Sequence, residues 1–350
     1  MNDASVFRVI HLIPYDGIGG VETAARSMRE HSRPTVNFCC HYIYRPPKTR
    51  AARLALFTPW PPFRAAVAIC AADTDLLIVS LWRSCIAALL AKLFRPRLRM
   101  VLFLHLSEDA HFLDRVLTWL VSFFAEEVWA DSKQTSAERL GQSADRVISF
   151  LIKHMDRVSS ARHAPRFIFW GRLNRQKNIP MALTLFHAIS ERIPDATYLI
   201  IGPDGGDKNK IISEIDRLGL NERVQLTGPA DREGIVESAF SSTFYLQTSM
   251  VEGMAMSVVE AMQMGIVPIV TPVGEIKNYC KHFDNAIIVK EMNETVDTVV
   301  NLFNDPAELE RLSVGASLYW RGRALYADDV FDACLDMLNK RAGSRSNHVH

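Results

Sequence analysis

Short apolar segments alternate with longer amphipathic segments along most of the chain. In the first half, each apolar segment is followed by a stretch with helical spacing of its apolar residues; these segments lie at 7–14, 75–80, 99–105 and 126–132. Short strands separated by helices are typical of parallel sheets built from right-handed βαβ units. The pattern therefore predicts an α/β fold.

The alternation weakens between residues 150 and 165 and restarts at "RFIFWGRL", residues 166–173. A chain of 350 residues suits two doubly wound domains. We predict a first Rossmann-like domain over 1–160, a second over 161–325, a closing helix over 326–340 and a disordered tail over 341–350. Because open α/β sheets bind ligands beyond the carboxyl ends of their strands, we expect the domains to face each other across a central cleft that holds the active site.

The composition is that of a soluble globular enzyme, with 48% hydrophobic and 23% charged residues. No apolar stretch is long enough to span a membrane. The first residues read as a strand and not as a leader peptide. The six cysteines form no C-x-x-C pair, which indicates reduced thiols in a cytoplasmic protein.

The net charge of +1 hides an uneven distribution. Residues 1–163 carry 21 Lys and Arg against 15 Asp and Glu, and the rest of the chain carries 19 against 24. No acid lies between Glu30 and Asp73, where the cations include Arg45, Lys48, Arg50 and Arg53. One interpretation is an anionic partner, such as the inner face of the plasma membrane or a lipid diphosphate, with nucleic acid disfavoured. The other is a solvated basic face.

A glycine-rich turn follows the first predicted strand, in "IPYDGIGGVETAARSM", residues 13–28. Gly19 and Gly20 precede a predicted helix, whose N-terminal N–H groups and dipole favour an anion. The spacing is neither G-x-G-x-x-G nor a Walker loop. Phosphate contact and a tight turn that needs positive φ are both open interpretations.

A cluster of cations follows the first strand of the second domain, in "FWGRLNRQKN", residues 169–178. Arg172, Arg175 and Lys177 lie between this strand and the next helix. An arginine fork and a mobile lysine charge suit a diphosphate. The alternative is a solvated basic loop.

Two carboxylates lie eight positions apart in "SMVEGMAMSVVEAMQMG", residues 249–265. Ser257 and Glu260 fit an S-x-x-E capping box, which would explain Glu260 without a ligand. That explanation does not extend to Glu252, which follows the predicted strand "TFYLQTS". A carboxylate there, with the N–H groups of the next loop nearby, can accept hydrogen bonds from sugar hydroxyls.

A single histidine, His105, ends a predicted strand of the first domain in "LHLSED", residues 104–109. Its position at a strand end suits a residue of the cleft. A lone histidine is also common as a structural residue, so both interpretations stay open.

The order of these motifs resembles the family 4 retaining glycosyltransferases of the GT-B fold. A Gly-Gly turn, a strand-end histidine, G-R-x(4)-K and Glu-x(7)-Glu follow one another in the family's order. The resemblance covers about residues 7–340 and is strongest over 167–275, where "YLIIGPDGG" and "LGLNERVQLTG" also fit. It implies two doubly wound Rossmann-like domains, the first on the acceptor side and the second binding a nucleotide sugar.

The resemblance also implies roles for single residues. Arg172 and Lys177 would bind the donor diphosphate, and Gly19 and Gly20 would approach it from the other domain. Glu252 would bind the donor sugar, Glu260 the ribose, and His105 would line the sugar near its anomeric carbon. The loop that follows Glu252 would add backbone contacts; its residues are Gly253, Met254, Ala255 and Met256.

The chain departs from the family pattern at two places. The family often has Gly-Phe-Gly after the first glutamate, where this chain has Gly253-Met254-Ala255. Ala255 keeps its N–H group but restricts φ. The family's Asn-Gly-Val-Asp segment is replaced by "FLIKHMD", residues 150–156.

The expected reaction is the transfer of a hexose from a GDP- or UDP-sugar to a hydroxyl of a glycan or lipid-linked acceptor, with retention and in surface polysaccharide biosynthesis. The family needs no metal, and we expect no other cofactor. A nucleotide-sugar epimerase of the same fold is an alternative, which would need a proton-abstracting pair that the sequence does not identify. A degenerate, non-catalytic subunit is another, and the retained site residues argue against it.

Overall fold

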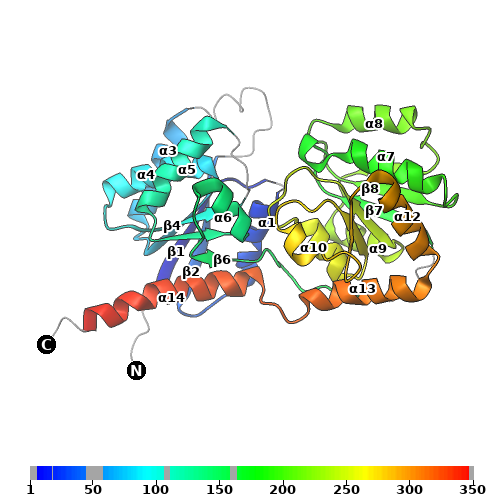
Figure 1. Cartoon of the computed structure of the whole chain (residues 1–350). Helices are drawn as coiled ribbons and strands as arrows, with labels where there is room; N and C mark the ends of the chain where they lie inside the picture. The colour runs from blue at the N-terminus through cyan, green and yellow to red at the C-terminus, as the bar shows by residue number, and fades with distance from the viewer. Residues whose placement is uncertain (1–5, 18, 45–57, 106–110, 158–163, 347–350) are drawn as a thin grey trace. The chain divides into compact units, whose positions relative to one another are not determined.

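The computed structural model describes residues 6–17, 19–44, 58–105, 111–157 and 164–346, with side chains up to residue 340. The chain forms two compact units (Figure 1). The first unit consists of Met1–Ile152 with Ala324–His350, and the second of Lys153–Arg323. The second unit thus begins earlier than the predicted residue 161, and the C-terminal segment belongs to the first unit.

The first unit contains a six-stranded parallel sheet in the order β2-β1-β3-β4-β5-β6. Its strands are β1 (Phe7–Tyr15), β2 (Val36–Tyr44), β3 (Leu76–Ser80), β4 (Arg99–Leu104), β5 (Glu127–Ala130) and β6 (Arg146–Val147). The apolar pattern did not predict β2. This edge strand carries polar residues among its apolar ones, so its hydrophobic signal is weaker than that of the buried β3.

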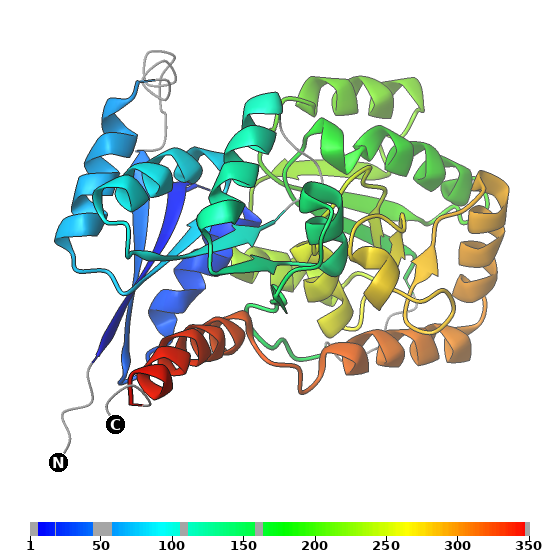
Figure 2. The ribbon, with the colours of Figure 1, turned by 60° about the vertical axis from the view of Figure 1, so that its left-hand side comes forward.

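Helices cover both faces of this sheet. They are α1 (Gly20–Ser27), the 3₁₀ turn η1 (Met28–Glu30), α3 (Trp60–Ala71), α4 (Trp82–Phe94), α5 (Phe112–Phe124), α6 (Lys133–Leu140) and α14 (Tyr326–Ser346). The helices α3, α4 and α5 share one apolar core with one face of the sheet. On the other face, α14 places Tyr326 against Phe103, and α14 lies beside α1 (Figure 2).

The second unit contains a second six-stranded parallel sheet, in the order β12-β11-β10-β7-β8-β9. Its strands are β7 (Arg166–Trp170), β8 (Thr197–Ile201), β9 (Val224–Gly228), β10 (Phe244–Gln247), β11 (Val267–Val270) and β12 (Ile287–Ile288). Its helices are η2 (Arg175–Lys177), α7 (Ile179–Ser190), α8 (Lys208–Arg217), α9 (Arg232–Phe240), α10 (Met256–Gln263), α11 (Ile276–Tyr279), α12 (Met292–Phe303) and α13 (Pro306–Trp320). The prediction of two doubly wound domains is confirmed.

The C-terminal helical segment differs from the prediction. It is divided into α13 in the second unit and α14 in the first, with Gly322 at φ 74° between them. The helix α14 begins at the predicted residue 326 but continues to Ser346, so residues 341–346 are helical where we predicted a disordered tail. A packed helix extends readily over further residues because propagation needs no new nucleus. Among the described residues, none of the helices is both long and apolar enough to cross a membrane.

Each sheet has a switch point, where the strand order changes direction. In the first sheet it lies between β1 and β3, and in the second between β7 and β10. Ligands of open α/β sheets bind beyond the carboxyl ends of the strands at this point. The loops that follow these four strands are therefore the expected positions of a ligand site.

Candidate functional site

The loop that follows β7, residues 171–178, carries the predicted Arg172 and Lys177. Two glycines after β8 allow the neighbouring backbone to approach it closely. A Cβ atom on Gly202 would lie 1.7 Å from the carbonyl oxygen of Gly171, and one on Gly205 would lie 2.8 Å from Arg172 Cγ. Any larger residue at these positions would displace the loop that carries the cations.

Two asparagines shape the end of the same loop. The Oδ1 atom of Asn174 accepts a hydrogen bond from the Lys177 N–H at 3.3 Å and caps the 3₁₀ turn η2. Asn178 then takes the left-handed conformation, with φ 48°, and α7 begins. Asparagine tolerates this conformation better than most residues. Lys177 is thereby held at the end of a defined turn.

Lys177 and Glu252 form a buried ion pair at the switch point of the second sheet. Lys177 Nζ lies 2.6 Å from Glu252 Oε1, and the two side chains are 14% and 6% exposed. The same oxygen accepts hydrogen bonds from Ser249 Oγ at 2.6 Å and from Gln247 Nε2 at 3.2 Å. The pair joins the loop after β7 to the loop after β10.

All three interactions end on one oxygen of the Glu252 carboxylate. Its Oε2 atom accepts no hydrogen bond from any residue that the structure describes. A carboxylate with one anchored oxygen keeps a fixed orientation and presents the other oxygen to a hydroxyl donor. Lys177 has two further N–H groups after the bond to Glu252, which suits an anionic ligand.

The loop after β10, residues 248–255, is fastened to the loop after β7 and to α11. The Met250 N–H donates to the Gln176 carbonyl at 2.8 Å, and Gln176 Nε2 donates to the Val251 carbonyl at 2.8 Å. From the other side, the Tyr279 hydroxyl donates to the Met254 carbonyl at 2.7 Å. The carbonyl groups of the loop are therefore used within the protein.

The N–H groups at the end of the same loop are not used in this way. Within the described part of the chain, no acceptor is recorded for those of Gly253, Met254, Ala255 and Met256. Ala255 takes the left-handed conformation, with φ 54° and ψ 68°, immediately before α10. The loop and the start of α10 thus offer free donors beside the carboxylate of Glu252.

The predicted capping box is wrong. The helix α10 begins one residue before Ser257, Ala255 is its N-cap, and no side chain caps it. The Ser257 hydroxyl instead donates to Gln247 Oε1 at 3.2 Å, so it supports the side chain that holds Glu252. Glu260 therefore lies within the helix and not at a cap position.

Glu260 is held by the strand β7. Its Oε2 atom accepts a hydrogen bond from the Trp170 indole at 2.9 Å. Burial raises the pKa of the Glu260 carboxyl, and the Trp170 bond and the charge of Arg232 act in the opposite direction. The residue as a whole is half-buried.

Gly19 and Gly20 lie where α1 begins in the first unit. Gly19 is the N-cap and has φ −168°, which is extended backbone, so the interpretation as a turn that needs positive φ is not supported there. Glu22 lies in the first turn of α1 and is buried. The negative charge of the Glu22 carboxylate already interacts with the positive end of the α1 dipole.

His105 follows β4 and shares a hydroxyl group with a second histidine. The Nε2 atoms of His105 and His11 each lie 2.7 Å from Ser80 Oγ. Burial lowers the pKa of His105 well below its usual value, and His11 and Arg139 lower it further. Burial also lowers the pKa of His11 to about 3, so both rings are neutral.

The single Ser80 proton fixes how these two rings are protonated. Ser80 can donate to only one Nε2 and must accept from the other, so the rings carry their protons on different nitrogens. Both Nδ1 atoms are buried without a partner in the described structure. The hydrogen bond to Ser80 therefore fixes the neutral His105 ring at the end of β4.

The structure brings some of the predicted residues together. Lys177 contacts Glu252 directly, and Glu260 is bonded to the strand that leads into the loop of Arg172. Gly19, Gly20 and His105 belong to the first unit, and their part in a shared site stays a prediction.

Sequence reasoning missed two polar residues that hold Glu252. Gln247 ends β10 and Ser249 follows it, and both are fully buried. The usable signal was position, because polar residues at the carboxyl end of a switch-point strand are candidates for a site. Sequence reasoning also missed Ser80 and His11.

The second unit is similar to a known family. Residues 153–316 match the family model described as "Glycosyl transferases group 1". A human protein that is one of the subunits of phosphatidylinositol N-acetylglucosaminyltransferase is 26% identical over 172 residues, which is 46% of this chain and 35% of that protein. The chain spans about a third of the length of the curated relatives it matches.

Two solved structures resemble the whole chain. HepE of Anabaena in complex with UDP has a TM-score of 0.76 at 16% identity, covering 95% of this chain and 100% of that one. The apo form of WaaB, a lipopolysaccharide outer core galactosyltransferase, has a TM-score of 0.67 at 17% identity, with 95% and 100% covered.

The likeness to these solved structures shows the class of fold, which is GT-B. The match to the glycosyl transferases group 1 model covers nearly all of the second unit, which contains Lys177 and Glu252. The prediction of a GT-B fold is thereby confirmed.

Proposed function

We propose that this protein transfers a hexose from a nucleotide-diphosphate sugar to a hydroxyl of a glycan or lipid-linked acceptor, with retention of configuration. The observation that carries the proposal is the buried Lys177–Glu252 pair at the switch point of the second sheet. The Lys177 ammonium group has two further N–H groups that can donate to a ligand. The Glu252 Oε2 atom accepts no hydrogen bond from the described residues and can accept one from a ligand. A diphosphate and the hydroxyls of a sugar are the groups that this pair suits.

The charges of the loop after β7 provide the electrostatic part of the mechanism. The bond between the sugar C1 and the phosphate oxygen breaks, and charge develops on the leaving diphosphate. Arg172 and Lys177 stabilise that charge, which is the largest effect available to a preorganised site. The acceptor oxygen forms the new bond to C1 on the same face, and its proton passes to the leaving phosphate oxygen.

Other residues orient the donor. Glu252 Oε2 accepts from sugar hydroxyls, Glu260 from the ribose, and the free N–H groups of residues 253–256 donate to the sugar or the diphosphate. His105 lines the donor sugar as a neutral ring. The likeness to HepE with UDP supports a nucleoside-diphosphate donor, either UDP or GDP. The likeness to WaaB supports an acceptor in surface polysaccharide biosynthesis.

A thermal-shift panel of UDP-, GDP- and ADP-sugars tests the donor. One class should stabilise the protein, by about 2.7 kcal/mol at a hundredfold excess over its Kd. Arg172→Ala should remove this shift and the turnover, whereas Arg192→Ala, which breaks an exposed ion pair with Asp297 in the same unit, should keep both. If no nucleotide sugar stabilises the protein, a non-catalytic subunit is the better interpretation.

The same assay tests the expected independence of metal ions. We expect turnover to persist in EDTA, because Arg172 and Lys177 supply the positive charge that a divalent cation would otherwise bring. Turnover lost in EDTA and restored by one divalent cation would contradict this part of the proposal.

A further inference from the structure

The helix α5 buries only part of its apolar residues: Val121 lies in the core, but two polar residues are buried beside it and several aromatic residues are exposed. Its buried face carries Asp114 and Thr118, and Asp114 forms a buried ion pair with Arg139 at 2.8 Å. Its outer face carries Phe112, Trp119 and Phe123, which are 80%, 52% and 65% exposed. A surface helix normally buries its apolar stripe, so the outer face of α5 is built for contact with an apolar environment.

The apolar outer surface continues over the two neighbouring helices. Trp60 and Phe63 of α3 stack with ring centroids 5.7 Å apart, and Phe63 meets Phe94 of α4 at 5.9 Å. The helices α3, α4 and α5 pack side by side over one face of the sheet, so their outer sides point away from it together. We call this surface the aromatic face; it consists of Trp60, Phe63, Phe94, Phe112, Trp119 and Phe123.

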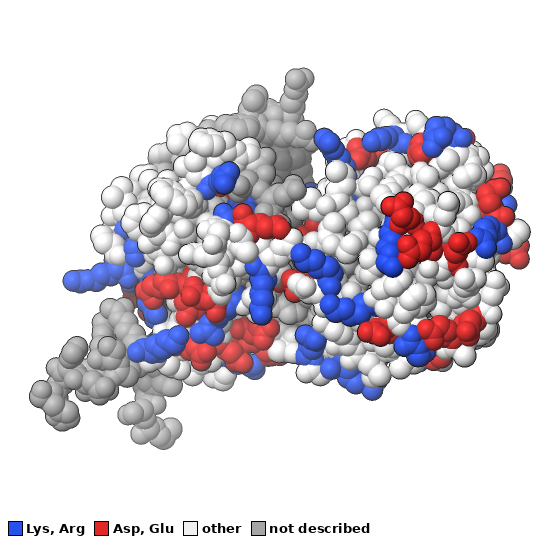
Figure 3. All heavy atoms as spheres, viewed as in Figure 1, with Lys and Arg blue, Asp and Glu red and all other residues white. Residues whose placement is uncertain are grey.

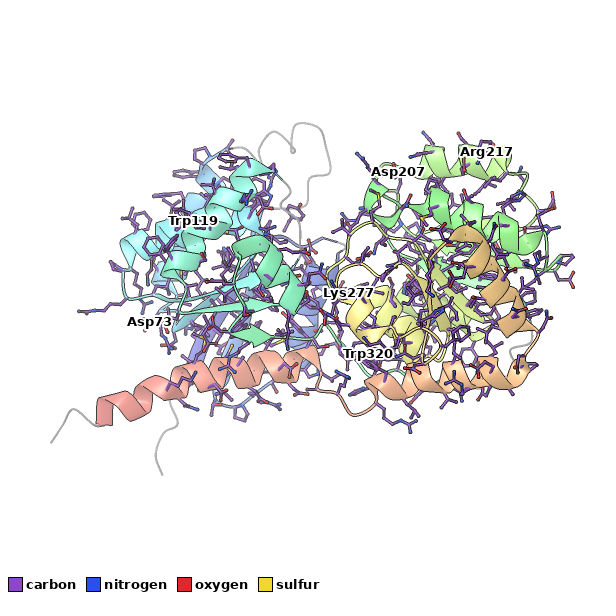
Figure 4. The ribbon with its side chains drawn as sticks, viewed as in Figure 1. Asp73, Trp119, Asp207, Arg217, Lys277 and Trp320 are labelled. Atoms are coloured by element: carbon purple, nitrogen blue, oxygen red, sulfur yellow. The ribbon has the colours of Figure 1, made fainter. Side chains whose placement is uncertain are left out.

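The exposed charges on the three helices of the aromatic face have one sign, and the acids that follow α3 and α5, Asp73 and Glu126, are paired with Arg95 and Arg99. On α3, α4 and α5 the charged residues that reach the surface are Arg64, Arg83, Lys92 and Arg115, and the single acid, Asp114, is buried. In Figure 3 the surface over α4 and α5 is mainly white with isolated blue groups, whereas red and blue alternate along α14. Trp119 can be found on α5 in Figure 4.

This charge pattern selects the occupant. A second copy of the chain, docked through the same surface, would bring arginines against arginines, which is unfavourable. A bilayer with anionic lipids offers both complements at once: aromatic rings are stable at the level of the headgroups, and arginines attract the anionic phosphates.

We propose that the aromatic face docks the protein on the surface of an anionic lipid bilayer. The aromatic side chains enter the headgroup region, and the arginines of the three helices lie at its level. The basic residues first considered for this role, Arg45, Lys48, Arg50 and Arg53, lie outside the described residues and are not needed. Docking does not depend on the donor chemistry of the second unit.

Vesicle co-sedimentation of the full chain tests the proposal. We expect binding to vesicles of phosphatidylcholine with phosphatidylglycerol, and weaker binding to phosphatidylcholine alone. The triple variant Phe112→Ser, Trp119→Ser, Phe123→Ser should partition on the order of 100-fold less, since it loses three interfacial anchors. The matched control Phe240→Ser removes an exposed aromatic residue of α9 in the second unit and should bind like the wild type.

A second variant separates charge from apolar contact. Arg64→Glu with Arg115→Glu should abolish the preference for phosphatidylglycerol and leave the aromatic residues in place. The donor-induced thermal shift should be unchanged in every variant, so a loss of vesicle binding can be told apart from a failure of the donor site.

Three results would overturn the proposal. One is the absence of wild-type binding to either vesicle, and another is equal binding by the triple variant. The third is a wild type that elutes as a dimer, becomes monomeric in the triple variant and does not bind vesicles, which would make the aromatic face an interface between copies.

Discussion

At the switch point of the second sheet a lysine and a glutamate are buried side by side, whereas at that of the first sheet two neutral histidines share one hydroxyl. Both sheets are parallel, six-stranded and doubly wound. The same architecture therefore places a charged cluster in one unit and an uncharged one in the other. The charged cluster has N–H groups and a carboxylate oxygen left for a ligand, whereas the ring nitrogens of the neutral cluster are bonded to Ser80 or buried.

Removing one residue from each cluster should also lower the free energy of unfolding by different amounts. A buried charge that loses its partner is strongly destabilising. A neutral hydrogen bond that loses its partner costs the desolvation of one polar group, about 1–3 kcal/mol. Mutation should consequently disturb the second unit more than the first, and the following experiments test that difference.

Lys177→Ala should give the largest effect. It leaves the carboxylate of Glu252 buried without its cation, so the free energy of unfolding should fall by about 3–5 kcal/mol. Urea denaturation measures the loss, and the double variant Lys177→Ala, Glu252→Gln should recover part of it. Lys290→Ala breaks an exposed ion pair with Glu294 and should cost at most about 0.5 kcal/mol. Equal effects of the two lysine variants would contradict the buried pair.

Gly274→Ala tests whether the position of Glu252 depends on its close neighbours. Gly274 has φ 56°, and an added Cβ would lie 2.0 Å from the Glu252 carbonyl oxygen. The added Cβ atom should displace the loop that carries Glu252 and so weaken donor binding. The free energy of unfolding should fall by more than the strain of a positive φ at residue 274 would cause alone. Gly322→Ala is the matched control, because Gly322 also has positive φ, at 74°, but nothing lies within 4 Å. The control should cost about 1–2 kcal/mol and keep donor binding.

The pH dependence of stability tests the neutral cluster of the first unit. The pKa values of His11 and His105 are lowered in the folded protein, so the unfolded chain binds protons first as the pH falls. The two histidines do not affect stability above about pH 6.5, and below it the free energy of unfolding falls by up to about 1.4 kcal/mol per pH unit for each histidine. Urea denaturation from pH 7 to pH 5 measures the slope. His11→Gln should remove about half of it, and an unchanged slope would show that other groups cause it.

The sequence allowed the fold to be predicted, because the fold follows from the strand–loop–helix order. The same order places four charged residues of the second unit near the switch point, and their roles stay predictions. Arg172, Lys177, Glu252 and Glu260 all lie in or after switch-point loops. The partners of these residues could not be predicted. Lys177 and Glu252 are 75 positions apart in the chain, so only folding shows that they touch.

The local sequence was misleading at Ser257. The S-x-x-E pattern predicted a cap, but the cap position is set by where the loop after β10 turns, and it turns at Ala255. That turn depends on bonds to the loop after β7 and to α11, which no local pattern contains. The exposed aromatic residues of α5 were missed for the opposite reason: the composition of the helix was visible, but which of its residues are buried depends on tertiary contacts such as the Asp114–Arg139 pair.

Ala255→Gly should give the smallest effect. Ala255 is in the left-handed region, where a residue with a Cβ atom is strained by about 1–2 kcal/mol, and glycine removes that strain. Glycine also lacks the buried methyl group of alanine. In addition, it makes the unfolded chain more flexible, and this flexibility alone lowers the free energy of unfolding by about 0.4–1 kcal/mol. We therefore expect the free energy of unfolding, measured by urea denaturation, to change by less than about 1 kcal/mol. Ala255→Val is the control and should destabilise clearly, since a β-branched residue is more strained at this φ. A large loss in Ala255→Gly would mean that the methyl group is needed to hold the loop beside Glu252.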